Sequence, residues 1–312
     1  MLSRRLLRIK VLKALYAHLK SESTNMITSE KTLMSSIDKA YDLYAQMLTL
    51  IVELARYAEQ RQELARQKKL PTHEDLNPNR RFVDNAVVRL IENSDSVNDF
   101  TAKRKLSWSQ APELVKTLYA TLSERDYFKA YMTAPETSFR DDLKLVQRFY
   151  TEELENCEML EEVLEEQSIM WNDDLGFALL LVLRTLSNVR KSTKEIRLLP
   201  EFKNEDDPAF ARTLFEKSLI GYNENLKTVE SFTRNWDSDR IAFMDNLIMA
   251  TAIAELVTFP SIPVKVTLDE YIEISKYYST AGSGMFINGV LDKVVEQFSA
   301  DGRIRKSGTG LI

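Results

Sequence analysis

The sequence predicts an all-α protein, from its composition and from the spacing of its apolar residues. Only 8 glycines and 8 prolines occur in 312 residues, whereas these two helix-breaking residues make up about 12% of an average chain. Apolar side chains recur every three or four positions over long stretches, most clearly in residues 30–67, and this spacing places them on one face of a helix. Hydrophobic residues make up 44% of the chain, enough for a folded core.

The expected helices follow one another with few long interruptions. The first, residues 3–20, is apolar on most sides beyond Val11, which predicts a buried central helix whose charged start projects from the bundle. Residues 70–81 contain two prolines and are expected to form a loop, and the polar residues 190–207 are the best candidate linker. Residues 267–270 read Thr-Leu-Asp-Glu, a capping box that would start a helix. The other predicted helices are, in chain order, 30–67, 82–104, 110–132, 136–167, 172–189, 208–231, 237–258, 268–279 and 284–299.

Charge is distributed unevenly along the chain. The net charge of −5 argues against a protein that binds nucleic acid through overall charge alone. Residues 1–21 nevertheless contain six lysines or arginines and no acid, whereas residues 152–174 contain ten acids and no base. The basic start can attract phosphate. The acidic stretch is expected to be the solvated face of a helix, and the alternative is a docking surface for a basic partner.

Few residues of the kinds that catalyse reactions or bind metals are present. The single cysteine, Cys157, excludes an internal disulfide, and one cysteine with two histidines argues against a zinc site. No phosphate-binding loop, dinucleotide fingerprint or zinc-protease motif occurs, and the apolar runs are too short to span a membrane. The sequence therefore predicts no enzymatic activity, no cofactor and no metal. The basic, acid-free start would also suit a mitochondrial presequence, which is the alternative to a first helix of the fold.

Two motifs at opposite ends of the chain point to one family. The last predicted helix contains Phe-Ile-Asn-Gly-Val-Leu-Asp-Lys at residues 286–293, and the first places Arg4, Arg5 and Arg8 before Ala-Leu-Tyr at residues 14–16. Together these motifs resemble the NusB family of transcription antitermination factors, in a long form with a large helical insertion.

The resemblance implies a fold and a function. Proteins of the family are all-helical and consist of two small bundles. They bind the single-stranded boxA element of nascent RNA together with the ribosomal protein NusE, and in the cytoplasm they help RNA polymerase to read through terminators, notably in ribosomal RNA operons, without catalysing a reaction. The RNA-binding residues that the resemblance implies here are Arg4, Arg5, Arg8, Tyr16, Ser283, Phe286, Asn288 and Lys293. The residues that it implies at the NusE contact are Asp245 and Glu255.

The same resemblance suggests a division of the chain. Residues 1–22 would be the basic helix that completes the NusB-like fold by packing with the C-terminal bundle at 201–299. Residues 23–200 would be an inserted helical region, and residues 300–312 a flexible tail. The family pattern is not fully kept, because Leu6, Leu7 and Ala250 replace common basic residues and Ala-Gly-Ser-Gly-Met at 281–285 replaces a charged stretch. Two other readings stay open: a helical protein–protein adaptor that has lost boxA recognition, and an RNA-binding module of the kind attached to ribosomal RNA methyltransferases.

Glycines occur at two places in and just before the last predicted helix, close to the residues implied in RNA binding. Gly289 stands in the middle of the helix, where it costs about 1 kcal/mol relative to alanine, so we expect another group to need the space above it. Gly282 and Gly284 flank Ser283 just before the helix. This turn could receive a phosphate at the helix start, or it could be a flexible connection in which Ser283 is the N-cap.

Overall fold

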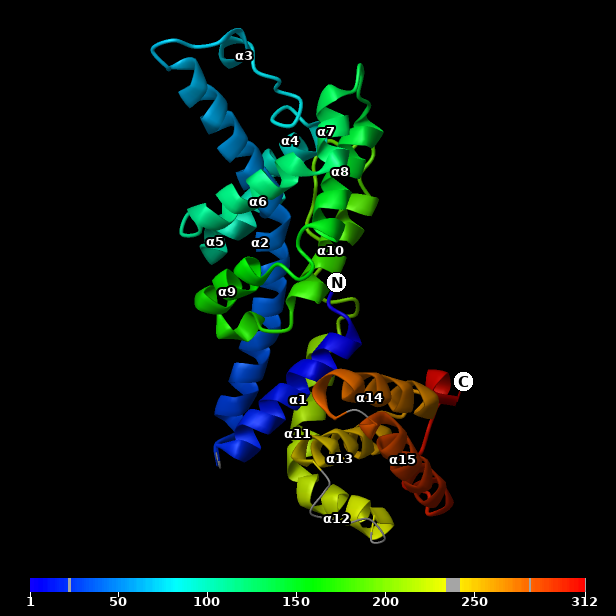
Figure 1. The fold of residues 1–312 in the computed structure, drawn as a ribbon. Helices are drawn as coiled ribbons and strands as arrows, with labels where there is room; N and C mark the ends of the chain where they lie inside the picture. Colours follow the sequence, from blue (N-terminus) through cyan, green and yellow to red (C-terminus); the bar gives the residue numbers. More distant parts are fainter. Residues whose placement is uncertain (22–23, 234–241, 281, 312) are drawn as a thin grey trace. The chain divides into compact units, whose positions relative to one another are not determined.

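The structure, a computed structural model, describes residues 1–21, 24–233, 242–280 and 282–311. The secondary structure of these residues is helical, and their one extended pairing is an isolated bridge between Leu2 and Phe202. The prediction of an all-α fold is therefore confirmed. The chain divides into two compact units, shown as one ribbon in Figure 1. We call Met1 with Asp38–Glu201 the insert unit, and Leu2–Ile37 with Phe202–Ile312 the terminal unit.

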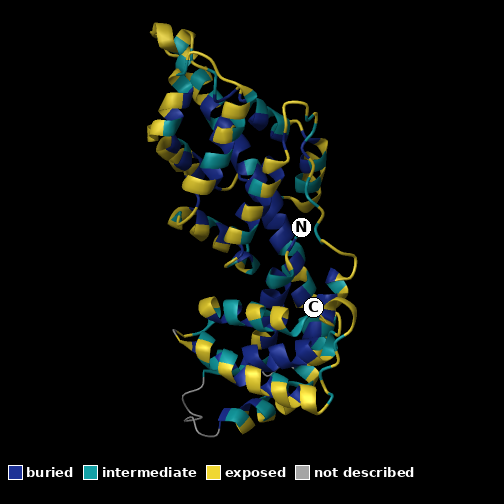
Figure 2. Ribbon diagram, turned by 90° about the vertical axis from the view of Figure 1, so that its right-hand side faces the viewer, coloured by how far each residue is buried: buried dark blue, intermediate teal, exposed yellow. Residues whose placement is uncertain are grey.

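The terminal unit is a bundle built around the first helix. This helix, α1 (Arg4–Lys20), begins at Ser3, whose hydroxyl accepts a hydrogen bond from the backbone N–H of Leu6 and so satisfies one of the free donors of a helix start. Leu7 and Val11 are fully buried, and buried residues run through the interior of each unit in Figure 2. The other helices of the terminal unit are the start of α2 (Met26–Arg66), α11 (Asp207–Ile220), α12 (Tyr222–Thr233), α13 (Phe243–Thr258), α14 (Val264–Tyr278), α15 (Ser283–Ala300) and the short 3-10 helix η3 (Gly308–Leu311).

The first helix lies alongside α14 in the same direction and alongside α13 in the opposite direction. The contacts that fix these directions are Arg5 with Glu270 and Lys13 with Tyr278 for α14, and Arg8 with Glu255 and Tyr16 with Phe243 for α13. The predicted packing of the first helix with the C-terminal bundle is thus confirmed.

The start of α2 belongs to the terminal unit, which differs from the expected domain division. His18 Nδ1 lies 2.7 Å from Ser29 Oγ, and Arg212 Nε lies 3.5 Å from Glu30 Oε1. These contacts hold the first turns of α2 against α1 and α11. The two units accordingly meet in the chain at 37/38 and 201/202, rather than at the expected 22/23 and 200/201.

The C-terminal segment, expected to be flexible, packs on the terminal unit as far as the structure describes it. Lys306 Nζ donates hydrogen bonds to the carbonyls of Leu256 and Phe259, at 2.9 and 3.0 Å. The N–H of Ser307 donates to the carbonyl of Pro260 at 3.0 Å. An ammonium group at the end of a helix satisfies unpaired carbonyls and opposes the helix dipole. The segment therefore closes the C-terminal end of α13.

The insert unit is built around the rest of α2. Tyr44 and Leu48 of α2 are fully buried, and Tyr150 donates its hydroxyl to the carbonyls of Met47 and Leu48. The other helices are α3 (His73–Leu76), α4 (Ala86–Glu92), α5 (Asp95–Arg104), α6 (Pro112–Glu124), α7 (Asp126–Thr133), α8 (Phe139–Glu152), α9 (Glu158–Gln167), the 3-10 helix η1 (Ile169–Trp171) and α10 (Leu175–Ser187). Three predicted helices are each two shorter ones, interrupted at Ser94, at Arg125 and near Asn156.

The predicted linker is tied to the insert unit by hydrogen bonds. Ser94 Oγ donates to the carbonyl of Ile196, and the N–H of Leu199 donates to the Tyr44 hydroxyl at 3.1 Å. The Tyr41 hydroxyl donates to the carbonyl of Leu199 at 2.6 Å. Up to Glu201, this segment is therefore part of the folded unit rather than a free connection.

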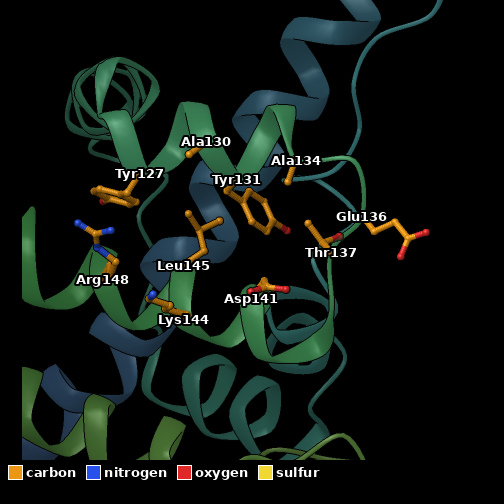
Figure 3. A pocket seen from close by; sticks show the side chains of 10 residues that line it. All are labelled: Tyr127, Ala130, Tyr131, Ala134, Glu136, Thr137, Asp141, Lys144, Leu145 and Arg148. Atoms are coloured by element: carbon orange, nitrogen blue, oxygen red, sulfur yellow. The ribbon is translucent and has the colours of Figure 1, made fainter.

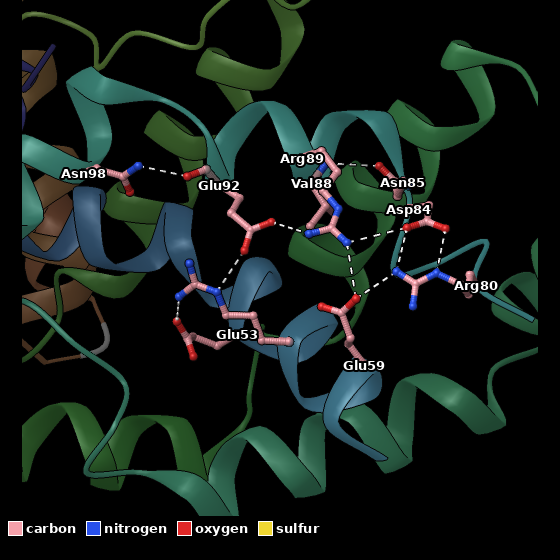
Figure 4. Close-up of polar contacts among 10 residues, drawn as sticks. Glu53, Glu59, Arg80, Asp84, Asn85, Val88, Arg89, Glu92 and Asn98 are labelled. Atoms are coloured by element: carbon pink, nitrogen blue, oxygen red, sulfur yellow. Dashed lines mark hydrogen bonds and ion pairs between the residues drawn. The ribbon is translucent and has the colours of Figure 1, made fainter. Parts of the chain in front are cut away.

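Ion pairs tie α4 and the segment before it to α2 on the surface of the insert unit (Figure 4). Arg80 contacts both Asp84 and Glu59, and Arg89 contacts both Glu59 and Glu92, over distances of 2.6 to 3.7 Å. Exposed pairs of this kind stabilise a fold by only about 0.2–1 kcal/mol each. Their second effect is electrostatic, because carboxylates neutralise these arginines of the insert unit.

Candidate nucleic-acid interface

The three arginines at the start of α1 each meet a carboxylate from a different helix. Arg4 Nε donates to Asp207 Oδ1 of α11 at 2.9 Å. Arg5 donates twice to Glu270 of α14, at 2.8 and 3.0 Å. Arg8 donates twice to Glu255 of α13, at 2.8 and 2.7 Å. In the sequence the three arginines form a local cluster, but nothing indicates that these three distant carboxylates are their partners.

Arg8 and Glu255 are part of the core. The Arg8 side chain is 2% exposed and the Glu255 side chain 0%, and Glu255 also accepts hydrogen bonds from the hydroxyls of Thr267 and Tyr271. Burial alone would lower the pKa of Arg8, but its hydrogen bonds to Glu255 and the charge of that carboxylate raise the pKa above the ordinary value. Because both side chains are buried, Arg8 cannot contact RNA and Glu255 cannot contact NusE in this arrangement. Both expectations are replaced by a structural role.

Asp245 and Ser283, expected to contact two different partners, bond to each other. Ser283 Oγ donates to Asp245 Oδ2 at 3.1 Å, and Ser279 donates to the other oxygen of the same carboxylate. Asp245 and Ser283 are each 5% exposed. The N-cap of α15 is Gly282, at a φ of 93°, a conformation that favours glycine. Asp245 therefore joins the start of α13 to the turn between α14 and α15.

Aromatic rings and lysines alternate at the other end of α1. Tyr16 is 41% exposed, and its ring packs edge-on against Phe243 with 5.6 Å between centroids. Lys20 Nζ lies 4.2 Å from the centroid of Phe243, and Lys13 Nζ lies 5.7 Å from that of Tyr278. We call Lys13, Tyr16, Lys20, Phe243 and Tyr278 the aromatic–lysine surface.

The aromatic–lysine surface has the composition of a single-strand binding surface. Aromatic faces stack unpaired bases, and lysines neutralise the phosphates between them. Lys20 keeps its charge in its contact with Phe243, because this attraction is to the quadrupole of the ring and not to a counter-charge. The five residues come from α1, α13 and α14, and Asp245 holds the start of α15 beside them.

The remaining predicted residues lie along α15. Phe286 and Asn288 are half-buried and Lys293 is exposed. Asn288 Nδ2 donates to Asp292 Oδ2 at 3.1 Å across one helical turn. Apart from Gly289 itself, its two chain neighbours and the nearby backbone of α15, no atom of the described structure lies within 4 Å of the position that a Cβ on Gly289 would occupy. No packed group of the described structure therefore uses the space above Gly289, which leaves the backbone of α15 open on an exposed face.

The predicted residues thus fall into two groups that α1 keeps apart. Arg4 and Tyr16 are twelve positions apart on α1, which corresponds to ~18 Å along a helix. Tyr16, Asp245 and Ser283 gather at one end of the bundle, and the arginines lie at the other. Sequence reasoning missed Phe243, Tyr278 and Lys20. The spacing of Lys13, Tyr16 and Lys20 would have indicated one helix face, but nothing local marks Phe243 or Tyr278 as their neighbours.

Metal-ligand clusters and membrane-crossing helices are both absent from the described part of the chain. It contains no group of three or more His, Cys, Asp or Glu side chains arranged to hold a metal ion, and none of its helices is long and apolar enough to cross a membrane. A hollow of about 300 Å³ lies between α7 and α8 of the insert unit, where the rings of Tyr127 and Tyr131 flank Leu145 (Figure 3). None of the predicted site residues lines it.

Comparison with known proteins defines the class as a transcription antitermination family. The NusB family model matches residues 177–296. The transcription antitermination protein NusB of Salinibacter ruber is 40% identical over 111 residues, which cover 35% of this chain and 69% of that protein. The protein of the same name from Chloroherpeton thalassium is 42% identical over 78 residues, 25% of this chain and 37% of that protein. That of Pseudothermotoga lettingae is 39% identical over 85 residues, 26% of this chain and 61% of that protein. No solved structure matches.

This chain belongs to the NusB family. The family match begins in α10, within the insert unit, and so extends further towards the N-terminus than the motifs suggested. Most of the insert unit lies outside the match, which agrees with a long form that carries an additional helical region. The match also leaves out α1, so the place of α1 in the fold rests on its packing with α11, α13 and α14.

Proposed function

We propose that this protein acts in transcription antitermination by binding a boxA-type single-stranded RNA together with NusE, in support of ribosomal RNA transcription. The observation that carries the proposal is the aromatic–lysine surface, which supplies rings and charges for unpaired bases and their phosphates. Each stacked base would contribute about 1–3 kcal/mol to binding. The proposed complex, which includes RNA polymerase, is cytoplasmic and involves no chemical step by this chain.

Phe286, Asn288 and Lys293 would extend the RNA surface along α15. Phe286 lies one turn beyond Ser283, and the open backbone at Gly289 lets a flat ligand or a second chain approach the helix closely. NusE would not contact Asp245 or Glu255 directly, since both are buried. The exposed face of α15 at Met285 and Gly289 is the better candidate for a protein contact.

Fluorescence anisotropy with a labelled boxA-like RNA and a scrambled RNA tests the proposal. Both RNAs are titrated with and without NusE, at two salt concentrations. We expect selective binding to the boxA-like RNA that NusE strengthens. Lys20→Gln should weaken it and lower the salt slope by up to about 0.7. Lys227→Gln is the matched control, because Lys227 is exposed on α12 of the same unit and lies outside the proposed surface.

Two observations favour a second candidate, the adaptor that has lost boxA recognition. All three arginines of α1 are paired with carboxylates, and five glutamates of α9 form an exposed acidic face in the insert unit: Glu158, Glu161, Glu162, Glu165 and Glu166. An absence of selectivity in the titration, with or without NusE, would favour this adaptor and reject the boxA proposal.

A further inference from the structure

We infer that Glu270 competes with RNA phosphates for Arg5, so that this carboxylate sets how strongly, and with what salt dependence, the arginine end of α1 binds RNA. The inference rests on the proposed RNA-binding function and adds a determinant of affinity to it. It concerns the end of α1 opposite to the aromatic–lysine surface.

Only two of the three arginines can reach a phosphate. The side chains of Arg4 and Arg5 are 34% and 42% exposed, whereas that of Arg8 is 2% exposed. Any RNA contact at this end of α1 must therefore use Arg4 or Arg5, and each already has a carboxylate partner.

The two carboxylates differ in how firmly the fold holds them. Asp207 is 1% exposed and accepts hydrogen bonds from the backbone N–H groups of Lys203 and Asn204 as well as from Arg4. Its position follows from the turn before α11 and not from Arg4. Glu270 is 21% exposed, its described hydrogen bonds are the two from Arg5, and Arg8 Nη1 lies 3.7 Å away. Glu270 is therefore the partner that a phosphate can replace.

Arg5 should bind Glu270 and an RNA phosphate with similar free energies. A partly exposed arginine–carboxylate pair is worth about 0.2–1 kcal/mol, and a phosphate offers Arg5 the same forked geometry. With Glu270 in place the arginine end carries three positive and three negative charges, so it has little attraction for RNA. Lys20, in contrast, packs on a ring and keeps its charge. RNA should therefore bind first at the aromatic–lysine surface and engage Arg5 only by displacing Glu270.

The test compares Glu270→Gln with Asp269→Asn. Asp269 is the exposed neighbour of Glu270 on α14, so Asp269→Asn removes the same charge without touching Arg5. Anisotropy titrations with the boxA-like and scrambled RNAs are run from low to high salt. For Glu270→Gln we expect binding to be tighter by a factor of about 1.4 to 5, as an exposed ion pair implies (~0.2–1 kcal/mol), and a salt slope steeper by ~0.7. Asp269→Asn should leave the slope unchanged, and Arg5→Gln added to Glu270→Gln should return it to the wild-type value.

The outcomes separate this inference from the proposed function. If the wild-type protein selects boxA but the slopes of Glu270→Gln and Asp269→Asn are equal, the competition is refuted and the function stands. If the wild-type protein shows no selectivity, the function fails. The competition is then judged on the scrambled RNA at low salt, where a steeper slope for Glu270→Gln still supports it and an unchanged slope refutes it. Thermal unfolding of each variant verifies that the bundle is intact.

Discussion

The buried pair of Arg8 and Glu255 lies in the core of the terminal unit. Glu255 joins three helices, because it accepts hydrogen bonds from α1 through Arg8 and from α14 through Thr267 and Tyr271. Burial and, next, the charge of Glu255 raise the pKa of Tyr271 well above its ordinary value, so the tyrosine remains a hydrogen-bond donor at physiological pH.

Removing the negative charge of Glu255 should destabilise the protein strongly. Glu255→Gln removes the buried carboxylate that is hydrogen-bonded to Arg8 and leaves only the more distant Glu270, 3.7 Å from Arg8 Nη1; breaking a buried ion pair in this way costs about 3–5 kcal/mol. Urea unfolding measures the change. Arg5→Gln is the control, since its more exposed pair should cost less than about 1 kcal/mol. Equal losses in the two variants would show that burial does not govern these pairs.

Replacing Gly289 by alanine should increase the stability of the protein but weaken its binding to RNA or NusE. A methyl group there would meet no described atom beyond its chain neighbours and the nearby backbone of α15, so Gly289→Ala should stabilise α15 by about 0.5–1 kcal/mol. Calorimetry or urea unfolding gives this value. If RNA or NusE approaches the open backbone, the same variant should bind more weakly even though it is more stable. A more stable variant with unchanged binding would remove Gly289 from the interface.

Among the elements, the helices with one continuous apolar pattern were predictable and the interrupted ones were not. The first helix was expected at 3–20 and is Arg4–Lys20, and the last was expected at 284–299 and is Ser283–Ala300. The capping box expected at 267–270 is not one, because α14 already starts at Val264. Its Thr267 and Glu270 instead bond to Glu255 and Arg5, partners more than ten positions away that no local pattern could indicate.

The candidate site follows the same rule. Tyr16 was predictable because a motif contains it, whereas Phe243 and Tyr278 become its neighbours only through the packing of α1 against α13 and α14. The carboxylates that neutralise the arginines come from α11, α13 and α14. Periodicity shows which face of a helix is buried, but not which charge on another helix will lie opposite.

The segment that ends at Glu201 should make stability depend on pH. Burial, and next the negative charge of Asp38, raise the pKa of Glu201 from 4.5 to about 7, with Asp42 adding to the rise and Arg104 opposing it. The folded state therefore binds more protons than the unfolded state between these values, so the free energy of unfolding should fall as pH rises from about 4.5 to about 7. Above about pH 7 the free energy of unfolding no longer falls on account of Glu201.

Glu201→Gln tests this dependence, because glutamine is neutral at every pH. We expect the variant to be more stable than the wild type at pH 8, and to show little or no such gain at pH 5, in urea unfolding at both values. Glu136→Gln, an exposed change in the same unit, should shift neither curve. A gain from Glu201→Gln that is equal at both pH values would show that Glu201 does not carry the effect.

At the scale of the whole molecule, the two units differ in charge as well as in fold. The insert unit contains 23 lysines and arginines against 29 acids, a net charge of −6, and the terminal unit contains 19 against 18, a net charge of +1. This difference favours the terminal unit over the insert unit as the part of the chain that would bind RNA. The acidic insert unit, whose arginines 56, 80 and 89 are all paired, is better suited to proteins than to RNA.

Because each unit has its own buried core, we predict that the two unfold in separate steps. Leu7 of α1 and Leu48 of α2 are both 0% exposed, and truncation of a core leucine to alanine costs about 2–5 kcal/mol. In differential scanning calorimetry of the full chain, Leu7→Ala should lower the transition of the terminal unit and Leu48→Ala that of the insert unit. Anisotropy at intermediate temperature should show that RNA binding is lost with the transition that Leu7→Ala moves. A single transition that both variants lower would instead mean that α2, which contributes to both units, couples them into one cooperative fold.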